Sequence, residues 1–199
     1  KIRLSSNGCR YSICDSISVR AQIVRLHSKE WGLFFREEFM NTGHFYYIKD
    51  QYFIDFPDPH LMKNKETIDG QPHDRPCFYA FLDTATKLYW MIPFSSQVDK
   101  FQKIYNTKID KYGKCDTILF GEVLGYEKAF LIQNMCPVSI LYIKNEYVDG
   151  IYKKPVRVDG RFERELQKKA RKVLALQRKG IRLIFPNVLE IERLLLLNK

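Results

Sequence analysis

The sequence has few cysteines and histidines, and neither type is arranged as a motif. Five cysteines are scattered along the chain, and no two of them form a C-x-x-C pair. Secreted domains held by disulfides carry dense, even-numbered cysteines, so we expect no disulfide framework and a cytoplasmic location. The four histidines also fall outside the spacings of metal-ligand motifs. The sequence therefore predicts no bound metal and no cofactor.

Long apolar runs are also missing. The best candidate, residues 194–197, is far shorter than the roughly 20 apolar residues that span a bilayer. The N-terminus contains no uninterrupted apolar segment of the kind found in secretory signals. No Gly-x-Ser-x-Gly motif is present, which disfavours a Ser-His-Asp hydrolase of the α/β-hydrolase type. We expect neither a membrane protein nor that class of hydrolase.

Basic residues, in contrast, are in excess. The chain has 33 Lys and Arg against 23 Asp and Glu, a net charge of +10, and its 14% aromatic content indicates a folded protein. Such a surplus favours a polyanionic partner, either nucleic acid or an anionic membrane surface. The most basic predicted helix, residues 162–179, does not combine strong amphipathicity with exposed aromatics. Membrane-surface binding is therefore disfavoured, and nucleic acid is the expected partner.

Residues 1–39 differ from the rest of the chain. They contain no methionine before Met40, and their hydrophobic pattern fits neither a helix nor a strand. Residues 36–38 (Arg-Glu-Glu) can be encoded by a purine-rich ribosome-binding sequence, and residues 33–35 (Leu-Phe-Phe) by a thymine tract of a terminator. One interpretation is an over-extended reading frame whose true start is Met40, and the other is a genuine extension. Residues 40–199 are predicted to be a single domain.

Short strand patterns separated by turn signals follow Met40. Together with helices late in the chain, they predict an α+β fold: a small antiparallel β-barrel or strongly curved sheet with peripheral helices, two of them C-terminal. We expect strands at 44–48, 77–83, 87–94, 117–124, 128–134, 138–143 and 181–185, helices at 96–108, 162–179 and 187–197, a helical turn or irregular segment at 49–56, and a loop at 62–76.

The most informative segment is residues 88–96, Leu-Tyr-Trp-Met-Ile-Pro-Phe-Ser-Ser. Its aromatic and β-branched residues predict a buried strand that ends at two hydroxyls. Ser95 or Ser96 then stands where an N-cap belongs, before a helical pattern that includes Lys100. A helix N-terminus with hydroxyls and lysines suits a phosphate group, whereas the alternative is an ordinary N-cap. Arg75 precedes the neighbouring strand and is expected at the same rim, either holding a phosphate or paired with Asp74.

A second set of candidate residues is basic and lies mainly on helix 162–179. Its basic residues suit a surface that follows the phosphate backbone of a nucleic acid. The alternative is an ordinary solvated surface, because acidic residues near the start of a helix and basic residues near its end also complement the helix dipole. Interleaved aromatics would suit stacking on single-stranded bases. The candidate RNA-contacting residues are Lys103, Lys153, Lys154, Arg157, Lys168, Lys169, Arg171, Lys172, Arg178 and Lys179.

Several motifs together resemble the toxins of type III toxin–antitoxin systems, the ToxN/AbiQ family, and most closely its CptN/TenpN-like branch. They are Phe-Tyr-Tyr-Ile at 45–48 leading to Tyr52, the Arg-Pro pair at 75–76, and Tyr-Trp-Met-Ile-Pro-Phe-Ser-Ser at 89–96. The resemblance covers roughly residues 44–199. It implies a compact MazF/PemK-like (SH3-like) antiparallel barrel with added helices. It also implies a phage-defence toxin that acts by abortive infection.

The activity that this resemblance implies is a metal-independent, sequence-selective endoribonuclease. The 2′-hydroxyl of the RNA attacks the phosphate and leaves a 2′,3′-cyclic phosphate and a 5′-hydroxyl. The expected partners are cellular RNA and an inhibitory, repeat-derived, structured RNA antitoxin, which joins the toxin in a protein–RNA oligomer. A non-catalytic RNA-binding protein remains the alternative from the residues alone.

The resemblance also implies site residues. Ser95 and Ser96 match the active-site hydroxyl pair, and Tyr52 matches the active-site tyrosine. The lysine of the family lies two residues after the hydroxyl pair, where this chain has Val98. We therefore expect Lys100 to take its role, with Lys103 second, and Arg75 and Lys100 to neutralise the reacting phosphate.

Overall fold

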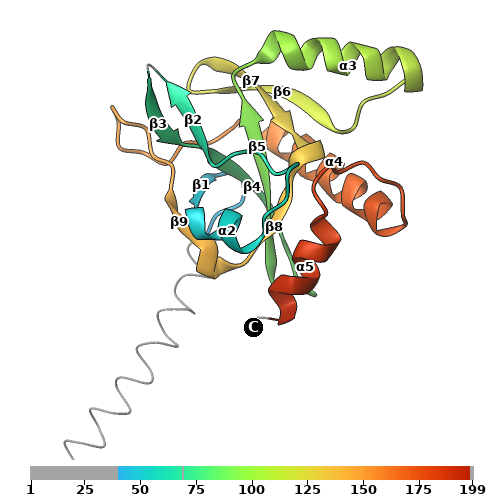
Figure 1. Ribbon diagram of the computed structural model, residues 1–199. Helices are drawn as coiled ribbons and strands as arrows, with labels where there is room; N and C mark the ends of the chain where they lie inside the picture. The colour runs from blue at the N-terminus through green and yellow to red at the C-terminus, as the bar shows by residue number, and fades with distance from the viewer. Residues whose placement is uncertain (1–39, 69, 198–199) are drawn as a thin grey trace, which may run out of the picture. The chain divides into compact units, whose positions relative to one another are not determined.

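The computed structural model of the protein describes residues 40–68 and 70–197 (Figure 1). Residues 41–199 form one compact unit. The interpretation of residues 1–39 as a misread extension lies outside the described residues. In chain order, the elements are β1 (Phe45–Ile48), α2 (Asp50–Asp55), β2 (Lys65–Ile68), β3 (Gln71–Asp74), β4 (Pro76–Asp83), β5 (Leu88–Ser95), α3 (Val98–Tyr112), β6 (Ile118–Val123), β7 (Tyr126–Leu131), β8 (Cys136–Val138), β9 (Ile143–Glu146), α4 (Gly160–Arg178) and α5 (Val188–Leu197).

The main sheet is antiparallel and has the order β6-β7-β5-β4-β1-β9 (Figure 1). One edge of β5 is shared by two strands, because β8 pairs with Tyr89–Met91 and β7 pairs with Phe94 and Ser95. Within the described part of the chain, the pairing path runs from β6 to β9 without joining these ends, so the sheet is open. The expected α+β fold with an antiparallel sheet and two C-terminal helices is confirmed.

An aromatic cluster fills the core face of this sheet. The rings of Phe45, Phe78, Phe94 and Phe130 contact one another at centroid distances of 5.3–6.2 Å. Because side chains alternate between the faces of a strand, these residues come from four strands yet meet on one side. Helix α4 covers the cluster with its apolar residues at 166, 170 and 173, as their helical spacing predicted.

The β6–β7 hairpin is held between two helices. On the core side, Phe162 of α4 packs on Phe130 at 4.9 Å between ring centroids. It also fills the space beside Gly121, where an added Cβ would lie 2.5 Å from its ring. On the other side, Phe101 and Tyr105 of α3 pack against a small cluster that includes Ala129. The hairpin is therefore fixed on both faces, which fixes the side chains at its end.

Three expectations for the secondary structure were wrong. Residues 62–76 are not a loop, because β2 and β3 form a separate two-stranded sheet there. The strand expected at 138–143 is divided into β8, a 3₁₀ turn at Ile140–Tyr142 and β9. No strand forms at 181–185, where Gln177 Oε1 instead accepts hydrogen bonds from the backbone N–H groups of Leu183 and Ile184. Strand pairing decided each outcome: β2 and β3 pair with each other across a short turn, β8 and β9 pair with different strands, and residues 181–185 pair with no described strand.

Candidate active site

The end of β5 brings a hydroxyl and an ammonium group together. Ser96 follows the last residue of β5 and is exposed, and its Oγ accepts a hydrogen bond of 2.8 Å from Lys128 Nζ. Lys128 is half-buried on β7, directly before Ala129, which pairs with Ser95. The pairing of β5 with β7 thus sets the distance between the two groups. A fixed cation beside an accessible hydroxyl is a suitable arrangement for binding a phosphate.

Ser95 has a different role from Ser96. Its side chain is buried, and its Oγ accepts a hydrogen bond of 3.2 Å from the backbone N–H of Gln97. The N-cap of α3 is Gln97, which makes no side-chain cap bond, so the expectation that Ser95 or Ser96 is the N-cap was wrong. The reason is that Ser95 still belongs to β5, where its hydroxyl closes the turn that precedes the helix.

The two lysines predicted for the site lie on α3. Lys100 and Lys103 have exposed side chains, and Lys100 Nζ lies 5.7 Å from the ring centroid of its neighbour Phe101. The ammonium that contacts Ser96 belongs to Lys128 instead. Sequence reasoning missed Lys128 because it lies 32 residues away on another hairpin. No local pattern marks it, and only the register of β5 with β7 could have revealed it.

Arg75 lies in the segment between β3 and β4. The pairing of β4 with β5 ends at Cys77 opposite Pro93, and two more residues along each antiparallel strand bring Arg75 level with Ser95. The backbone N–H of Arg75 donates a 2.7 Å hydrogen bond to the carbonyl of Asn64. This places the start of the arginine side chain at the same end of the sheet as Ser96, as the sequence predicted.

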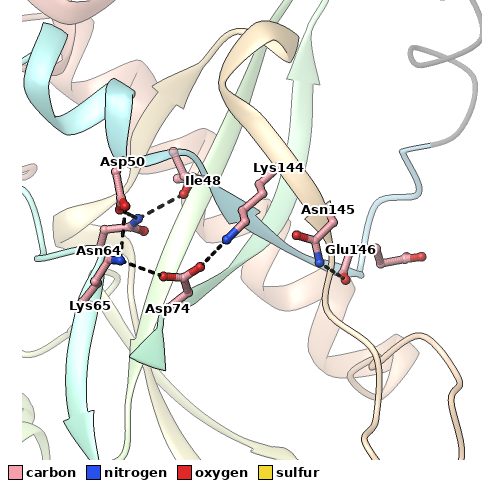
Figure 2. Close-up of polar contacts among 8 residues, drawn as sticks. All are labelled: Ile48, Asp50, Asn64, Lys65, Asp74, Lys144, Asn145 and Glu146. Atoms are coloured by element: carbon pink, nitrogen blue, oxygen red, sulfur yellow. Dashed lines mark hydrogen bonds and ion pairs between the residues drawn. The ribbon is translucent and has the colours of Figure 1, made fainter. Parts of the chain in front are cut away.

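A polar network holds this end of β3 in place (Figure 2). Asp74 accepts a 2.6 Å hydrogen bond from Lys144 Nζ on β9 and lies 3.6 Å from Lys65 Nζ. Asn64 Nδ2 donates to Asp50 Oδ1 at 2.6 Å, and Lys65 Nζ lies 3.2 Å from the same carboxylate. The hydrogen bond from Asn64 and then that from Lys65 lower the pKa of Asp50. The network ties the β2–β3 hairpin, and so the approach to Arg75, to the β9 edge.

Tyr52 lies in the core. Its ring is fully buried, and its hydroxyl donates a 2.8 Å hydrogen bond to the carbonyl of Pro137. Burial raises the pKa of Tyr52 well above its ordinary value. Pro137 pairs with Trp90, which is five residues, or roughly 17 Å of extended strand, from Ser95. The structure therefore does not bring Tyr52 to the hydroxyl pair, and the residue packs where β8 meets β5.

Several bases of α4 are committed to contacts within the protein. Lys169 Nζ lies 3.1 Å from Glu165 Oε1, and Lys172 Nζ lies 2.6 Å from Asp116 Oδ2. The Arg171 guanidinium lies 4.2 Å from the ring centroid of Phe81. Lys168 and Lys179 are exposed and make no ion pair with another described residue. Lys168 and Lys179 therefore add positive charge to the surface of α4. The ion pairs that the other lysines make on this surface contribute little energy.

The segment between β9 and α4 presents further bases. Asp149 Oδ1 accepts hydrogen bonds from the backbone N–H groups of Ile151 and Tyr152, which shapes a tight turn. Lys153 and Lys154 follow it with exposed side chains. Arg157 is also exposed, and its backbone pairs with that of His44 in an isolated antiparallel β-bridge. These three bases therefore add exposed positive charge outside α3 and α4.

Arg178 is the most firmly held of the predicted RNA contacts. Its Nη2 lies 2.7 Å from Asp83 Oδ2 and 2.5 Å from Glu192 Oε1, so it joins the β4–β5 turn, α4 and α5. Burial tends to raise the pKa of Asp83, but hydrogen bonds from Arg178 and from the backbone N–H of Ala85 outweigh it. The pKa of Asp83 is therefore below its ordinary value of 3.8.

Arg178→Met is expected to lower the free energy of unfolding at pH 7 by about 1–2 kcal/mol, since two largely buried carboxylates lose a partner that is itself partly exposed. A lowered carboxyl pKa stabilises the fold above the unfolded value and ceases to do so as the pH falls through the folded value. Wild type should therefore lose this contribution below about pH 4, and Arg178→Met should lose less. Thermal melting at pH 7 and pH 3 measures both. An equal loss in Lys179→Met, an exposed neighbour, would contradict this assignment.

No protein-family model matches the sequence, and no curated protein matches it either. Among the residues that the structure describes, no three His, Cys, Asp or Glu side chains are grouped so that they could hold a metal ion. No described helix is both long and apolar enough to cross a membrane. What the site can do is therefore argued from its own geometry.

Proposed function

We propose that the protein is a metal-independent endoribonuclease whose reacting phosphate binds at Ser96 and Lys128. The observation that carries the proposal is the 2.8 Å hydrogen bond between Lys128 Nζ and Ser96 Oγ at the exposed end of β5. Because Ser96 Oγ accepts this bond, its own O–H can donate to a phosphate oxygen. The two side chains together then offer a charge and a directed donor to one phosphate.

In the proposed reaction, the 2′-hydroxyl oxygen of a ribose bonds to the adjacent phosphorus and the bond from phosphorus to the 5′ oxygen breaks. The proton of the 2′-hydroxyl ends on that 5′ oxygen, which leaves a 2′,3′-cyclic phosphate and a 5′-hydroxyl. The pentacoordinate phosphate carries extra negative charge, which Lys128 and Arg75 neutralise. Lys100, in the first turn of α3, adds positive charge from a greater distance. Ser95 keeps the turn at Gln97 in shape.

The proposal extends to the fold family of the protein and to its inhibitor. We propose that the open antiparallel sheet is a variant of the SH3-like barrel of MazF/PemK ribonucleases, as in toxins of the ToxN/AbiQ family. The inhibitor would be a structured RNA bound in an oligomeric assembly. Support comes from the net charge of +10 and from the exposed bases Lys153, Lys154 and Lys168, which suit a polyanionic partner.

The test is incubation of the purified protein with a mixed RNA in EDTA, with both product ends mapped. We expect discrete cuts that carry a 2′,3′-cyclic phosphate and a 5′-hydroxyl, and we expect Ser96→Ala to cut far more slowly. Thr107→Ala, an exposed hydroxyl variant on α3, is the matched control. RNA that is bound but left intact would reject the catalytic proposal and favour a non-catalytic RNA-binding protein.

A further inference from the structure

Tyr126 lies beside the proposed site, and its ring packs against no other aromatic ring among the residues that the structure describes. It is the first residue of β7, two residues before Lys128, and its side chain is 69% exposed. Lys128 Nζ, the group that donates to Ser96 Oγ, lies 5.6 Å from the centroid of the Tyr126 ring. Residues two apart on a strand share a face. The ring and the phosphate-binding pair are therefore neighbours on one surface.

The turn before Tyr126 fixes the backbone from which its ring projects. Leu124 and Gly125 connect β6 to β7 with φ angles of 53° and 79°, the conformation of a two-residue type I′ hairpin turn. Val123 pairs with Tyr126 in the register and is buried in the core. A tyrosine side chain has only two χ angles, so it loses little conformational entropy when a flat ligand stacks on its ring.

We propose that Tyr126 is the stacking site for the base of a nucleotide next to the phosphate held by Ser96 and Lys128. This inference rests on the proposed function and specifies how the substrate binds. The substrate is single-stranded RNA, and one of its bases stacks on the ring of Tyr126. Base–aromatic stacking accepts any base, because every base has a π-face. The ammonium of Lys128 is close to both the ring and Ser96 Oγ, so it can attract the phosphate while the base covers the ring.

The chain offers a matched control for this proposal. Tyr112 is 62% exposed, and Lys111 Nζ lies 5.2 Å from the centroid of its ring. Tyr112 therefore matches Tyr126 in residue type, in exposure and in having a lysine ammonium near its ring. Tyr112 is the last residue of α3, about 20 Å along the helix from the turn at Ser96. A general effect of removing a surface tyrosine should appear at both positions.

The experiment measures kcat/KM for cleavage of a short RNA that contains one mapped site. Tyr126→Ala should lower kcat/KM by about 10- to 100-fold, which corresponds to about 1.4–2.8 kcal/mol of stacking. Tyr126→Phe keeps the ring and should stay within about threefold of wild type, as should Tyr112→Ala. An abasic nucleotide on the stacking side of the cut should slow wild type similarly and slow Tyr126→Ala no further.

Three results would overturn the inference while leaving the ribonuclease intact: wild-type rates in Tyr126→Ala, an equal loss in Tyr126→Phe, or an equal loss in Tyr112→Ala. Binding of the same RNA with a 2′-deoxy group at the cut is measured in parallel. If wild type cuts no RNA, the proposed function fails, and binding of an unmodified single-stranded RNA still tests Tyr126. Weaker binding by Tyr126→Ala alone would then support the stacking site, and equal binding by all variants would reject it.

Discussion

Lys128→Met should reduce the rate of RNA cleavage by about 100- to 1,000-fold, the usual loss when one group that stabilises transition-state charge is removed. The ammonium contacts Ser96 Oγ and has no carboxylate partner among the described residues, so the variant should fold normally. Single-turnover cleavage of the mapped RNA gives the rate of the chemical step. A melting temperature close to that of wild type would show that the loss is chemical and not structural.

The control for this result is Lys100→Met, which alters the lysine expected from the sequence to act in the site. Lys100 is exposed in the first turn of α3, and we expect its removal to slow cleavage by less than about tenfold, because solvent screens its charge. Full activity in Lys128→Met with a severe loss in Lys100→Met would return the role to Lys100.

Phe130→Ala should lower the free energy of unfolding by about 3–5 kcal/mol, the usual cost of removing a buried aromatic ring. Phe130 is fully buried and contacts the rings of Phe45, Phe78, Phe94 and Phe162. Its loss opens a cavity where β7 meets β5, two residues from Lys128 on the same face of β7. Urea unfolding followed by tryptophan fluorescence measures the change.

Phe120→Ala is the matched control, since Phe120 lies on the neighbouring strand of the same hairpin but is only half-buried. Its ring contacts Tyr105 of α3, and we expect a loss of about 1–2 kcal/mol. Equal losses at the two positions would mean that the aromatic cluster is not the centre of the core.

Local patterns in the sequence predicted the elements that depend on local chemistry. The aromatic and β-branched run at 88–94 became β5, and the helical spacing of Leu166, Ala170 and Val173 became the buried side of α4. Gly180, with φ at 88°, follows the C-cap Lys179, a position at which glycine commonly ends a helix. In these segments, burial periodicity and turn preference point to the same structure.

The sequence did not predict the contact between two distant segments at the end of β5. Nothing near Lys128 marks it as a partner of Ser96, because the contact comes from the pairing of β5 with β7. Tyr52 has the residue type of a catalytic group, yet its position on the inner side of α2 buries it. Residue types and their spacing in the sequence identify candidate site residues. The pairing register of the strands decides which of these residues lie on the same surface.

The distance in sequence between Ser96 and Lys128 has a consequence for how the protein is made. The two residues are 32 positions apart, so at about 5–20 residues per second the hydroxyl is synthesised roughly 2–6 s before the ammonium. Helix α4, which covers the β6–β7 hairpin, comes later still. A nascent chain therefore cannot complete this pair until β7 has also been synthesised and has paired with β5.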